Sequence, residues 1–241
     1  MTILHADSIG KSRGTRRVLT AATLKVEAGT VVGVLGRMGE GKSTLLKICA
    51  GIEAPDSGWV LFAGVQSSRA RFSHAAQRGL YYLADSWDLA PALTVRQHLQ
   101  IVERRFGTAS AQWAVEILRI ERLLDTAVGA LSGGEIRRAE LAVAATRAPK
   151  CLLADEPFRG VDPLSAELLG AMLRALIDRG VAVVVTGHEI TSMVPYVDQI
   201  VWVTAGTTYP LGTPAQAWRH ERFRCDYLGP GAASDWPISA A

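Results

Sequence analysis

Cysteine is scarce in this chain of 241 residues, and the three that occur stand too far apart to indicate a disulfide framework or a metal site. They are Cys49, Cys151 and Cys225, an odd number without any C-x-x-C pair. We therefore interpret all three as reduced thiols that serve in packing, as expected in a reducing compartment.

Long apolar runs are also missing. Hydrophobic residues make up 49% of the chain, yet no stretch approaches the roughly 18 consecutive apolar residues of a membrane span. Residues 1–7 lack the charged-then-apolar layout of a signal peptide. The sequence therefore predicts a cytoplasmic protein, long enough to bury a substantial core within one domain.

A large charge excess of either sign is absent as well. The 26 Lys and Arg residues exceed the 23 Asp and Glu residues by only three. Basic residues are scattered, apart from short pairs such as Arg16-Arg17 and Arg137-Arg138. This pattern gives no reason to expect a nucleic-acid partner. The chain also has no internal repeat and no low-complexity tract.

Two patterns of apolar residues predict strands. Apolar and polar residues alternate over residues 2–9 and 18–26, as in half-buried strands of an antiparallel region. Continuous apolar runs predict strands buried on both faces of a parallel sheet, and these are residues 31–35, 79–84, 150–154 and 181–186. We expect residues 198–203 and 207–211 to close the fold as edge strands.

Helical periodicity dominates the middle of the chain. Residues 95–106 and 110–124 carry apolar residues three and four positions apart, without β-rich runs. Another helix is expected from Pro163 to Asp178, capped by Asp162. The predicted fold class is α/β, with a mostly parallel sheet, an N-terminal antiparallel β region and an inserted helical subdomain. We expect one domain over residues 1–228 (core 1–84 and 150–228, helical subdomain about 85–149) and a flexible tail over 229–241.

The clearest functional signal is a glycine-rich segment that directly follows the apolar run 31–35. It matches G-x-x-x-x-G-K-[ST] between a predicted strand and a predicted helix, the context expected of a phosphate-binding P-loop. Glycines let successive N–H groups converge on phosphate oxygens, and the helix start adds its positive dipole end. A simple structural elbow is the alternative, but eight features in fixed register would have to coincide. The segment consists of Gly36, Arg37, Met38, Gly39, Glu40, Gly41, Lys42, Ser43 and Thr44.

Within this segment, we expect Lys42 to reach the β- and γ-phosphates and the Ser43 hydroxyl to bind Mg²⁺. A second part of the site is predicted where the apolar run 151–154 ends in Asp155 and Glu156. Asp155 would hold Mg²⁺ through its water shell, and Glu156 would act as general base on the attacking water. The alternative is an ordinary strand end with two solvated acids.

A second anion site is predicted before the helix expected over residues 136–147. A serine and two glycines at a helix N-terminus can bind an anion. A single parallel sheet has one phosphate crevice, so this site must serve another nucleotide. A helix N-cap followed by flexible glycines explains the run equally well. The run consists of Leu131, Ser132, Gly133, Gly134 and Glu135.

In order and spacing, these segments, together with residues 158–162 and His188, resemble the ATP-binding subunits of ABC transporters. The resemblance covers about residues 3–228, and L-S-G-G-E is its most specific motif. Within the family, residues 155–163 and 220–229 are similar to the ATPases of lipopolysaccharide export and branched-chain amino-acid import.

The resemblance implies a P-loop ABC-type ATPase with ATP and Mg²⁺ as ligands. It also implies a head-to-tail homodimer, in which ATP lies between the phosphate loop of one subunit and Ser132, Gly133 and Gly134 of the other. His188 would lie near the γ-phosphate, although strand-end histidines are commonly just hydrogen-bonded, and Asp162 would link the two sites across the interface.

Two positions depart from the family pattern. Asp85 stands where the family usually has Gln; it would still bind Mg²⁺ or its water, or else serve only as a helix cap. Arg13 stands where an aromatic residue commonly stacks on adenine. Its guanidinium plane can also stack on a base, and an exposed arginine in a turn is the alternative.

The predicted function is ATP hydrolysis that drives conformational change in separate membrane-spanning permease subunits. This implies a peripheral position on the cytoplasmic face of the membrane. Residues 86–94 are the expected coupling surface, with Trp87, Leu89 and Leu93 as partly exposed contacts, unless some of them pack in the core. The alternatives are a soluble ABC-type ATPase acting on nucleic acid or ribosomes, and a non-hydrolysing regulatory subunit. The substrate and direction of transport depend on the permease.

Overall fold

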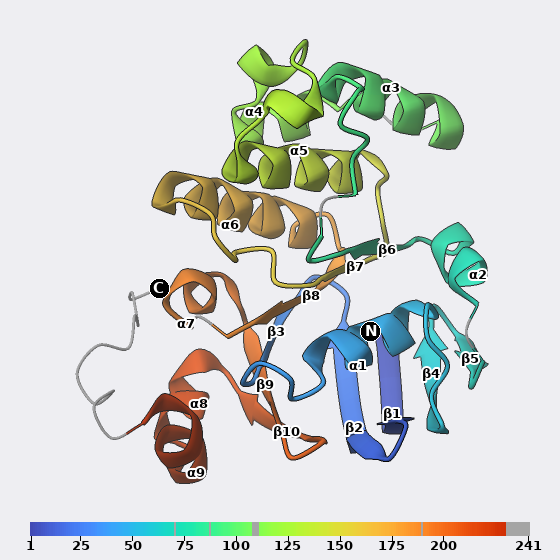
Figure 1. Cartoon of the computed structure of the whole chain (residues 1–241), viewed down its shortest axis with the longest axis vertical. Coiled ribbons are helices and arrows are strands. Elements are labelled where there is room, and N and C mark those ends of the chain that lie inside the picture. Colours follow the sequence, from blue (N-terminus) through green and yellow to red (C-terminus); the bar gives the residue numbers. More distant parts are fainter. Residues whose placement is uncertain (70, 87, 108–110, 189, 230–241) are drawn as a thin grey trace.

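Strands of both predicted patterns join in one ten-stranded sheet in the computed structural model, which describes residues 1–69, 71–86, 88–107, 111–188 and 190–229 (Figure 1). The spatial order of its strands is β5-β4-β1-β2-β10-β9-β3-β8-β7-β6. The strands are β1 (Thr2–Arg13), β2 (Arg16–Glu27), β3 (Val31–Leu35), β4 (Ser57–Phe62), β5 (Val65–Ser67), β6 (Leu80–Leu83), β7 (Cys151–Ala154), β8 (Ala182–Gly187), β9 (Gln199–Thr204) and β10 (Thr207–Gly212).

The parallel half of the sheet is formed by the continuous apolar runs. β6, β7, β8, β3 and β9 pair in parallel, and every residue of β3 and β7 is buried. The antiparallel half contains the alternating strands β1 and β2 together with β4 and β5. The prediction of a mostly parallel core with an N-terminal antiparallel region is therefore confirmed.

The prediction that the last two strands lie at the edges is wrong. β9 pairs with β3 in parallel and with β10 in antiparallel fashion, and β10 also meets β2 through Thr207 and Ala21. Buried side chains on both faces explain this inner position, since Ile200, Val201 and Trp202 are at most 7% exposed. β5 and β6 are the edge strands.

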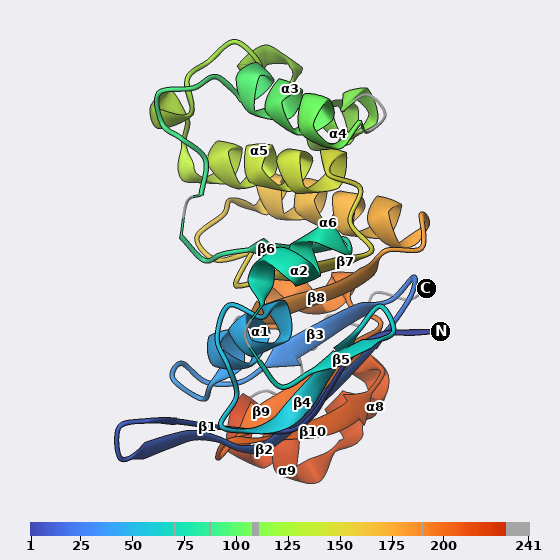
Figure 2. The same ribbon diagram turned by 90° about the vertical axis from the view of Figure 1, so that its right-hand side faces the viewer.

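The longer helices form layers above the parallel strands. In Figures 1 and 2, α6 covers the sheet, α5 lies on α6, and α3 and α4 lie outermost. No helix among the described residues is long and apolar enough to cross a membrane. The helices are α1 (Lys42–Ala50), α2 (Phe72–Gln77), α3 (Val95–Phe106), α4 (Gln112–Leu118), α5 (Gly133–Thr146), α6 (Pro163–Ile177), α7 (Ile190–Met193), α8 (Pro214–Arg219) and α9 (Glu221–Phe223), with short turns at Glu121–Leu123, Val128–Ala130, Val194–Tyr196 and Arg224–Leu228.

The helix expected over residues 110–124 is interrupted. α4 ends at Leu118, because Arg119 takes a left-handed conformation with φ 51°, and a short 3-10 turn follows. Helix α3 spans the predicted residues. The limits of the helical subdomain stay a prediction, because one apolar cluster runs from Val95 and Leu99 of α3 to Val183 and Val185 of the sheet.

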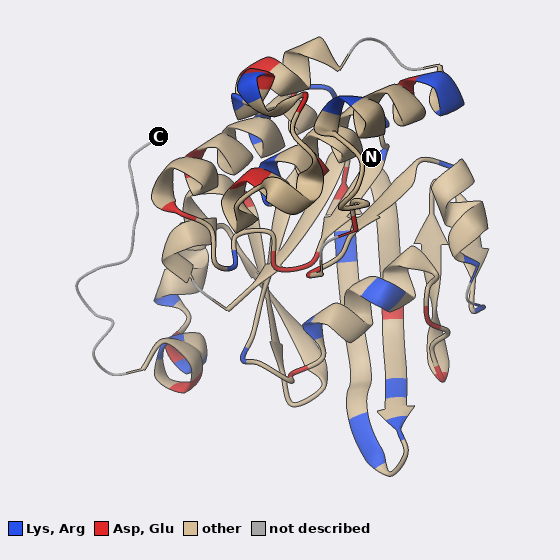
Figure 3. Ribbon diagram, turned by 45° about the horizontal axis from the view of Figure 1, so that its top comes forward, with Lys and Arg blue, Asp and Glu red and all other residues tan. Residues whose placement is uncertain are grey.

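The cysteines and the expected coupling surface are partly buried. Cys49 and Cys151 are buried as expected, but Cys225 is exposed and serves no packing role. Leu89 is buried in the core and Leu93 is partly exposed. Trp87 and residues 230–241 of the expected tail lie outside the described residues. Charged residues of both signs are scattered over the sheet and helices, with basic residues near the tip of the β1–β2 hairpin (Figure 3).

Candidate nucleotide-binding and hydrolysis site

The predicted phosphate loop connects β3 to the start of α1, where the chain must come close to its neighbours. Gly41 has φ 99°, and a Cβ on it would lie 2.7 Å from Cδ2 of Leu19. A Cβ on Gly36 would lie 2.6 Å from the carbonyl oxygen of Val203. Only glycine fits at both positions, so the loop packs directly on β2 and β9. The path of a phosphate cradle is thus fixed by the surrounding sheet.

Lys42 lies beneath this loop. Its Nζ donates hydrogen bonds to the carbonyl oxygens of Gly36 at 2.8 Å and Arg37 at 3.2 Å, and the side chain is only 5% exposed. Burial lowers the pKa of Lys42, while the carboxylates of Glu156 and Asp155 act in the opposite direction. The ammonium group is therefore held at the loop, where a phosphate would meet it.

The remaining loop residues have varied surroundings. The Arg37 guanidinium donates to the carbonyl oxygen of Asp226 at 2.6 Å. Met38 is 78% exposed, whereas Thr44 is buried, with only 8% of its surface exposed. Glu40 accepts a hydrogen bond from the backbone N–H of Ala205 at 2.9 Å. The loop is therefore tied to the C-terminal part of the chain from both sides.

Asp155 is the centre of a buried hydroxyl cluster. Its Oδ1 accepts from Ser43 Oγ at 3.0 Å and Thr186 Oγ1 at 2.7 Å, and its Oδ2 accepts from the Tyr82 hydroxyl at 3.1 Å. The residue is 2% exposed. The adjacent oxygens of Ser43 and Asp155 are the hard donors that Mg²⁺ prefers, so two of the three predicted metal ligands are brought together.

Sequence reasoning missed Tyr82 and Thr186. Both stand at the carboxyl ends of strands near β7, one in β6 and one in β8. Polar residues near the ends of such buried strands mark the edge where open α/β sheets bind ligands, and this signal could have identified them. Burial and the nearby Asp155 carboxylate raise the pKa of Tyr82, so its hydroxyl keeps its proton and donates to Asp155.

Glu156 adopts an unusual backbone conformation for a non-glycine residue, with φ 50°. Its N–H donates to Thr186 Oγ1 at 2.8 Å, which helps to hold this conformation. The carboxylate lies between two other predicted residues: Oε1 is 3.7 Å from Lys42 Nζ, and Oε2 is 3.0 Å from His188 Nδ1. Strain of this kind is common at functional sites. The three residues predicted to be catalytic thus meet in one place.

The C-terminal turn, Arg224–Leu228, contacts His188, one of these three residues. The Tyr227 hydroxyl donates to the carbonyl oxygen of His188 at 3.1 Å. The Tyr227 ring stacks on Phe223, which is fully buried, with 5.2 Å between centroids. Burial raises the pKa of Tyr227 to about 12, so the hydroxyl stays protonated at neutral pH. Tyr227 belongs to the stretch 220–229 that carried the family likeness, but nothing in the sequence indicated its contact with His188.

Removal of the Tyr227 hydroxyl tests whether it positions His188. We expect Tyr227→Phe to lower the rate of ATP hydrolysis about threefold to tenfold, the range for one lost hydrogen bond, without changing ATP affinity. The control is Tyr209→Phe, whose hydroxyl accepts from Arg222 Nη1 at 3.3 Å. Equal losses in steady-state kinetics of both variants would contradict this role.

The predicted second anion site has the geometry of a capping box. Ser132 caps α5, with its Oγ 3.4 Å from the N–H of Glu135, while the Glu135 carboxylate accepts from the N–H and hydroxyl of Ser132 at 2.8 and 2.7 Å. Gly133 and Gly134 lie inside the first helical turn, since α5 begins at Gly133, three residues before the expected start at Ile136. Leu131 precedes the cap and packs against the main apolar cluster.

Asp162 lies directly against this segment. A Cβ on Gly134 would lie 2.8 Å from Oδ2 of Asp162, so glycine is required for α5 to approach the start of α6. Asp162 caps α6 by accepting from the N–H of Ser165 at 2.9 Å and its hydroxyl at 2.6 Å. These bonds lower the pKa of Asp162. Its predicted role at a subunit interface stays a prediction.

The two departures from the family pattern have partners of their own. Asp85 Oδ2 pairs with Arg159 Nη1 at 2.8 Å, and Arg13 pairs with Glu53 at 2.8 Å. Arg16 contacts the phosphate loop instead, donating to the carbonyl oxygen of Gly39 at 3.1 Å. The metal role of Asp85 and the base-stacking role of Arg13 stay predictions.

Comparison with known proteins decides the family. The ABC transporter profile matches residues 19–159. The chain is 34% identical to the lipopolysaccharide export system ATP-binding protein LptB of Haemophilus influenzae, over 95% of this chain and 98% of that protein. This chain belongs to the ABC transporter family. It is an ATP-binding ATPase subunit, and both the family resemblance and the likeness to lipopolysaccharide-export ATPases are confirmed.

Other similarities place this ABC ATPase among cassettes of known fold. It is 35% identical to the Nod factor export ATP-binding protein I of Burkholderia lata, over 94% of this chain and 77% of that protein. An ATP-binding cassette named MJ1267 superposes with a TM-score of 0.81 at 23% identity, covering 91% of this chain and 94% of the other. A dimeric cassette named MJ0796, bound to ADP and Pi, gives 0.76 at 22% identity, covering 87% and 99%. The fold class is thereby confirmed.

Proposed function

We propose that this ABC ATPase hydrolyses MgATP at two equivalent sites of a homodimer and thereby drives separate membrane permease subunits. The observation that carries the proposal is the Glu156 carboxylate, which lies 3.7 Å from Lys42 Nζ and 3.0 Å from His188 Nδ1, beside the Ser43–Asp155 pair. This arrangement supplies a phosphate ligand, a base and a group that orients the base.

Each residue has a separate part in the proposed mechanism. The loop N–H groups and Lys42 bind the β- and γ-phosphates. Glu156 orients the attacking water and accepts its proton, while the close contact with His188 Nδ1 fixes the direction of the carboxylate. Ser43 and Asp155 would hold Mg²⁺, which neutralises the charge that develops on the phosphate oxygens when it is bound.

The homodimer part of the proposal rests on self-complementarity. One chain carries both the phosphate loop and the complete Ser132-Gly133-Gly134 segment, so two copies related by a twofold axis complete two equal sites. The dimeric cassette among the similar structures supports this arrangement. A second, different ATPase chain found in equal amount in the purified complex would contradict it.

The partner part of the proposal concerns residues 86–94. Helix α5, which is capped by Ser132, holds the backbone just before and within this region: Arg137 donates to the carbonyl oxygens of Ala84 at 2.9 Å and Asp85 at 3.0 Å, and Glu140 accepts from the N–H of Asp88 at 2.8 Å. Arg137 and Glu140 are each 1% exposed and lie 3.0 Å apart. Movement of α5 would therefore move the proposed coupling surface.

Purification from membranes tests this part. We expect a tagged chain to bring down a protein with several membrane spans, and we propose a peripheral location on the cytoplasmic face through that partner. Recovery with ribosomes or nucleic acid instead would favour the alternative function of a soluble ATPase.

Asp85 provides a test of coupling. We expect Asp85→Ala to lower ATPase stimulation by the permease more than the basal rate, because it removes the ion pair to Arg159 at the junction between sheet and helices. Asp85→Gln should retain activity. The measurement compares the basal and the permease-stimulated ATPase rates of each variant in the same preparation. Equal loss of both rates in Asp85→Ala would assign the residue to the chemistry alone.

A further inference from the structure

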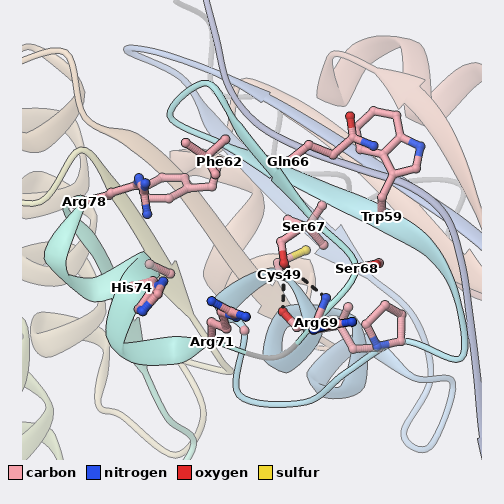
Figure 4. Close-up of a pocket in the computed structure, with 16 residues that line it drawn as sticks. Cys49, Trp59, Phe62, Gln66, Ser67, Ser68, Arg69, Arg71, His74 and Arg78 are labelled. Atoms are coloured by element: carbon pink, nitrogen blue, oxygen red, sulfur yellow. Dashed lines mark hydrogen bonds between the residues drawn. The ribbon is translucent and has the colours of Figure 1, made fainter.

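A cavity of about 580 Å³ lies at the opposite end of α1 from the phosphate loop, between α1, α2 and the strands β4 and β5 (Figure 4). This volume falls within the range of about 300–1,000 Å³ that is typical of small-molecule sites. None of the residues assigned above to ATP, Mg²⁺ or catalysis lines it. The cavity is therefore a separate feature of the cassette.

The rim of the cavity is basic. Arg69, Arg71, Arg78 and His74 contribute to the lining, and no Asp or Glu does. All four side chains are exposed. Figure 4 shows Arg71, His74 and Arg78 along α2 on one side, with Trp59, Gln66 and Ser67 along β4 and β5 on the other. An anion entering the cavity would meet cationic groups first.

Nearby acidic side chains do not neutralise this rim. In the described part of the chain, the turn that precedes β4 pairs its carboxylates with other cations: Asp56 with Lys11 at 3.0 Å, and Glu53 with Arg13 at 2.8 Å. Within the described ranges, the three rim arginines have no carboxylate within ion-pair distance. Their charge is thus available to a ligand.

The floor of the cavity is apolar. Ile48, Cys49, Val60 and Phe62 line it and are each at most 9% exposed. Burial raises the pKa of the Cys49 thiol to about 12, so this group stays uncharged at neutral pH. A floor of this kind favours an apolar group, because binding removes apolar surface from water.

We propose that this cavity binds a small amphiphile that has an apolar body and a phosphate group. The body would lie on the floor around Cys49 and Phe62, and the phosphate would lie between Arg71 and Arg78. Guanidinium groups suit this ligand because their paired N–H donors match phosphate oxygens. A phosphate of this chemistry occurs both in lipid headgroups and in free phosphate esters, and the experiment distinguishes the two.

The test is calorimetric titration of the purified full-length chain saturated with a non-hydrolysable MgATP analogue, which fills the phosphate loop, including the γ-phosphate position. The probes are octyl phosphate, ethyl phosphate, inorganic phosphate and the uncharged octyl glucoside, all below their micelle concentrations. We expect one octyl phosphate per chain, bound at least about tenfold more tightly than the other three probes. Ethyl phosphate bound as tightly as octyl phosphate would overturn the role of the apolar floor and indicate a free phosphate ester.

Two variants locate the binding. Arg71→Gln and Arg78→Gln should each weaken octyl phosphate binding on the order of tenfold, the loss expected for one charge-assisted contact. Arg104→Gln is the matched control, since Arg104 is exposed on α3 away from the cavity. MgADP affinity and melting temperature should stay unchanged in all three, which shows that they fold.

Two further results would overturn the proposal. One is octyl phosphate binding that all three variants leave equal, which would place the ligand elsewhere. The other is no binding of any probe together with loss of the permease from membrane preparations of Arg71→Gln and Arg78→Gln. That result would make the basic rim a surface for an acidic protein segment.

Discussion

Glu156→Gln should bind ATP normally and lose turnover by about 10²–10⁴-fold, the range typical of a missing general base. Gln has the size of Glu but cannot accept the proton of the attacking water. Lys42 keeps its hydrogen bonds to the carbonyl oxygens of Gly36 and Arg37, and Ser43 keeps its bond to Asp155, so the phosphate and metal ligands remain in place. Since ATP is proposed to join the subunits and hydrolysis to release them, the variant should accumulate as an ATP-bound dimer.

Single-turnover hydrolysis, nucleotide affinity and dimer mass, measured on wild type and variant, check this result. Glu27→Gln is a suitable control, because Glu27 lies on the surface at the end of β2. Near-normal turnover in Glu156→Gln would remove Glu156 from the role of base. His188, whose Nδ1 lies 3.0 Å from the Glu156 carboxylate, would then be the next candidate to orient the water.

Ser132→Arg should abolish the ATP-dependent dimer and lower hydrolysis by about 10²-fold or more, because a bulky side chain replaces the hydroxyl that is proposed to donate to the phosphate of the partner's nucleotide. ATP binding to the chain's own phosphate loop should remain. The substitution also removes the cap of α5, which costs about 0.5–2 kcal/mol.

Ser132→Ala separates these two effects, since it loses the same cap without adding bulk. Light scattering with ATP, in the non-hydrolysing Glu156→Gln background, measures the dimer. Weaker dimers in Ser132→Ala than in wild type would reflect the lost hydroxyl and the lost cap together, whereas undiminished dimers in Ser132→Arg would contradict the trans role of Ser132.

Local patterns were sufficient to predict most elements of this fold. The apolar run before the phosphate loop became β3, Asp162 capped α6, and α3 matched its predicted limits. In each case the deciding information lies within a few neighbouring residues: burial pattern, cap or glycine position. The residues of the phosphate loop could be predicted for the same reason, since the motif is continuous in sequence.

Features that depend on distant residues could not be predicted in this way. The place of β9 and β10 depends on pairing with β3 and β2, about 170 to 190 residues earlier. The contact of Tyr227 with His188 and that of Asp85 with Arg159 likewise join separate parts of the chain. The periodicity of apolar residues does not show which distant segments come into contact.

The inner position of β9 and β10 has a consequence for how the protein is made. β2 and β3 are neighbours along the chain, yet in the described sheet they are separated by two strands from residues 199–212. Those two strands are synthesised long after β2 and β3, so the antiparallel and parallel halves of the sheet cannot join through them until residues 199–212 have left the ribosome. Such long-range pairing slows folding, and nascent chains that stop before residue 199 should expose the unpaired edges of β2 and β3 to aggregation.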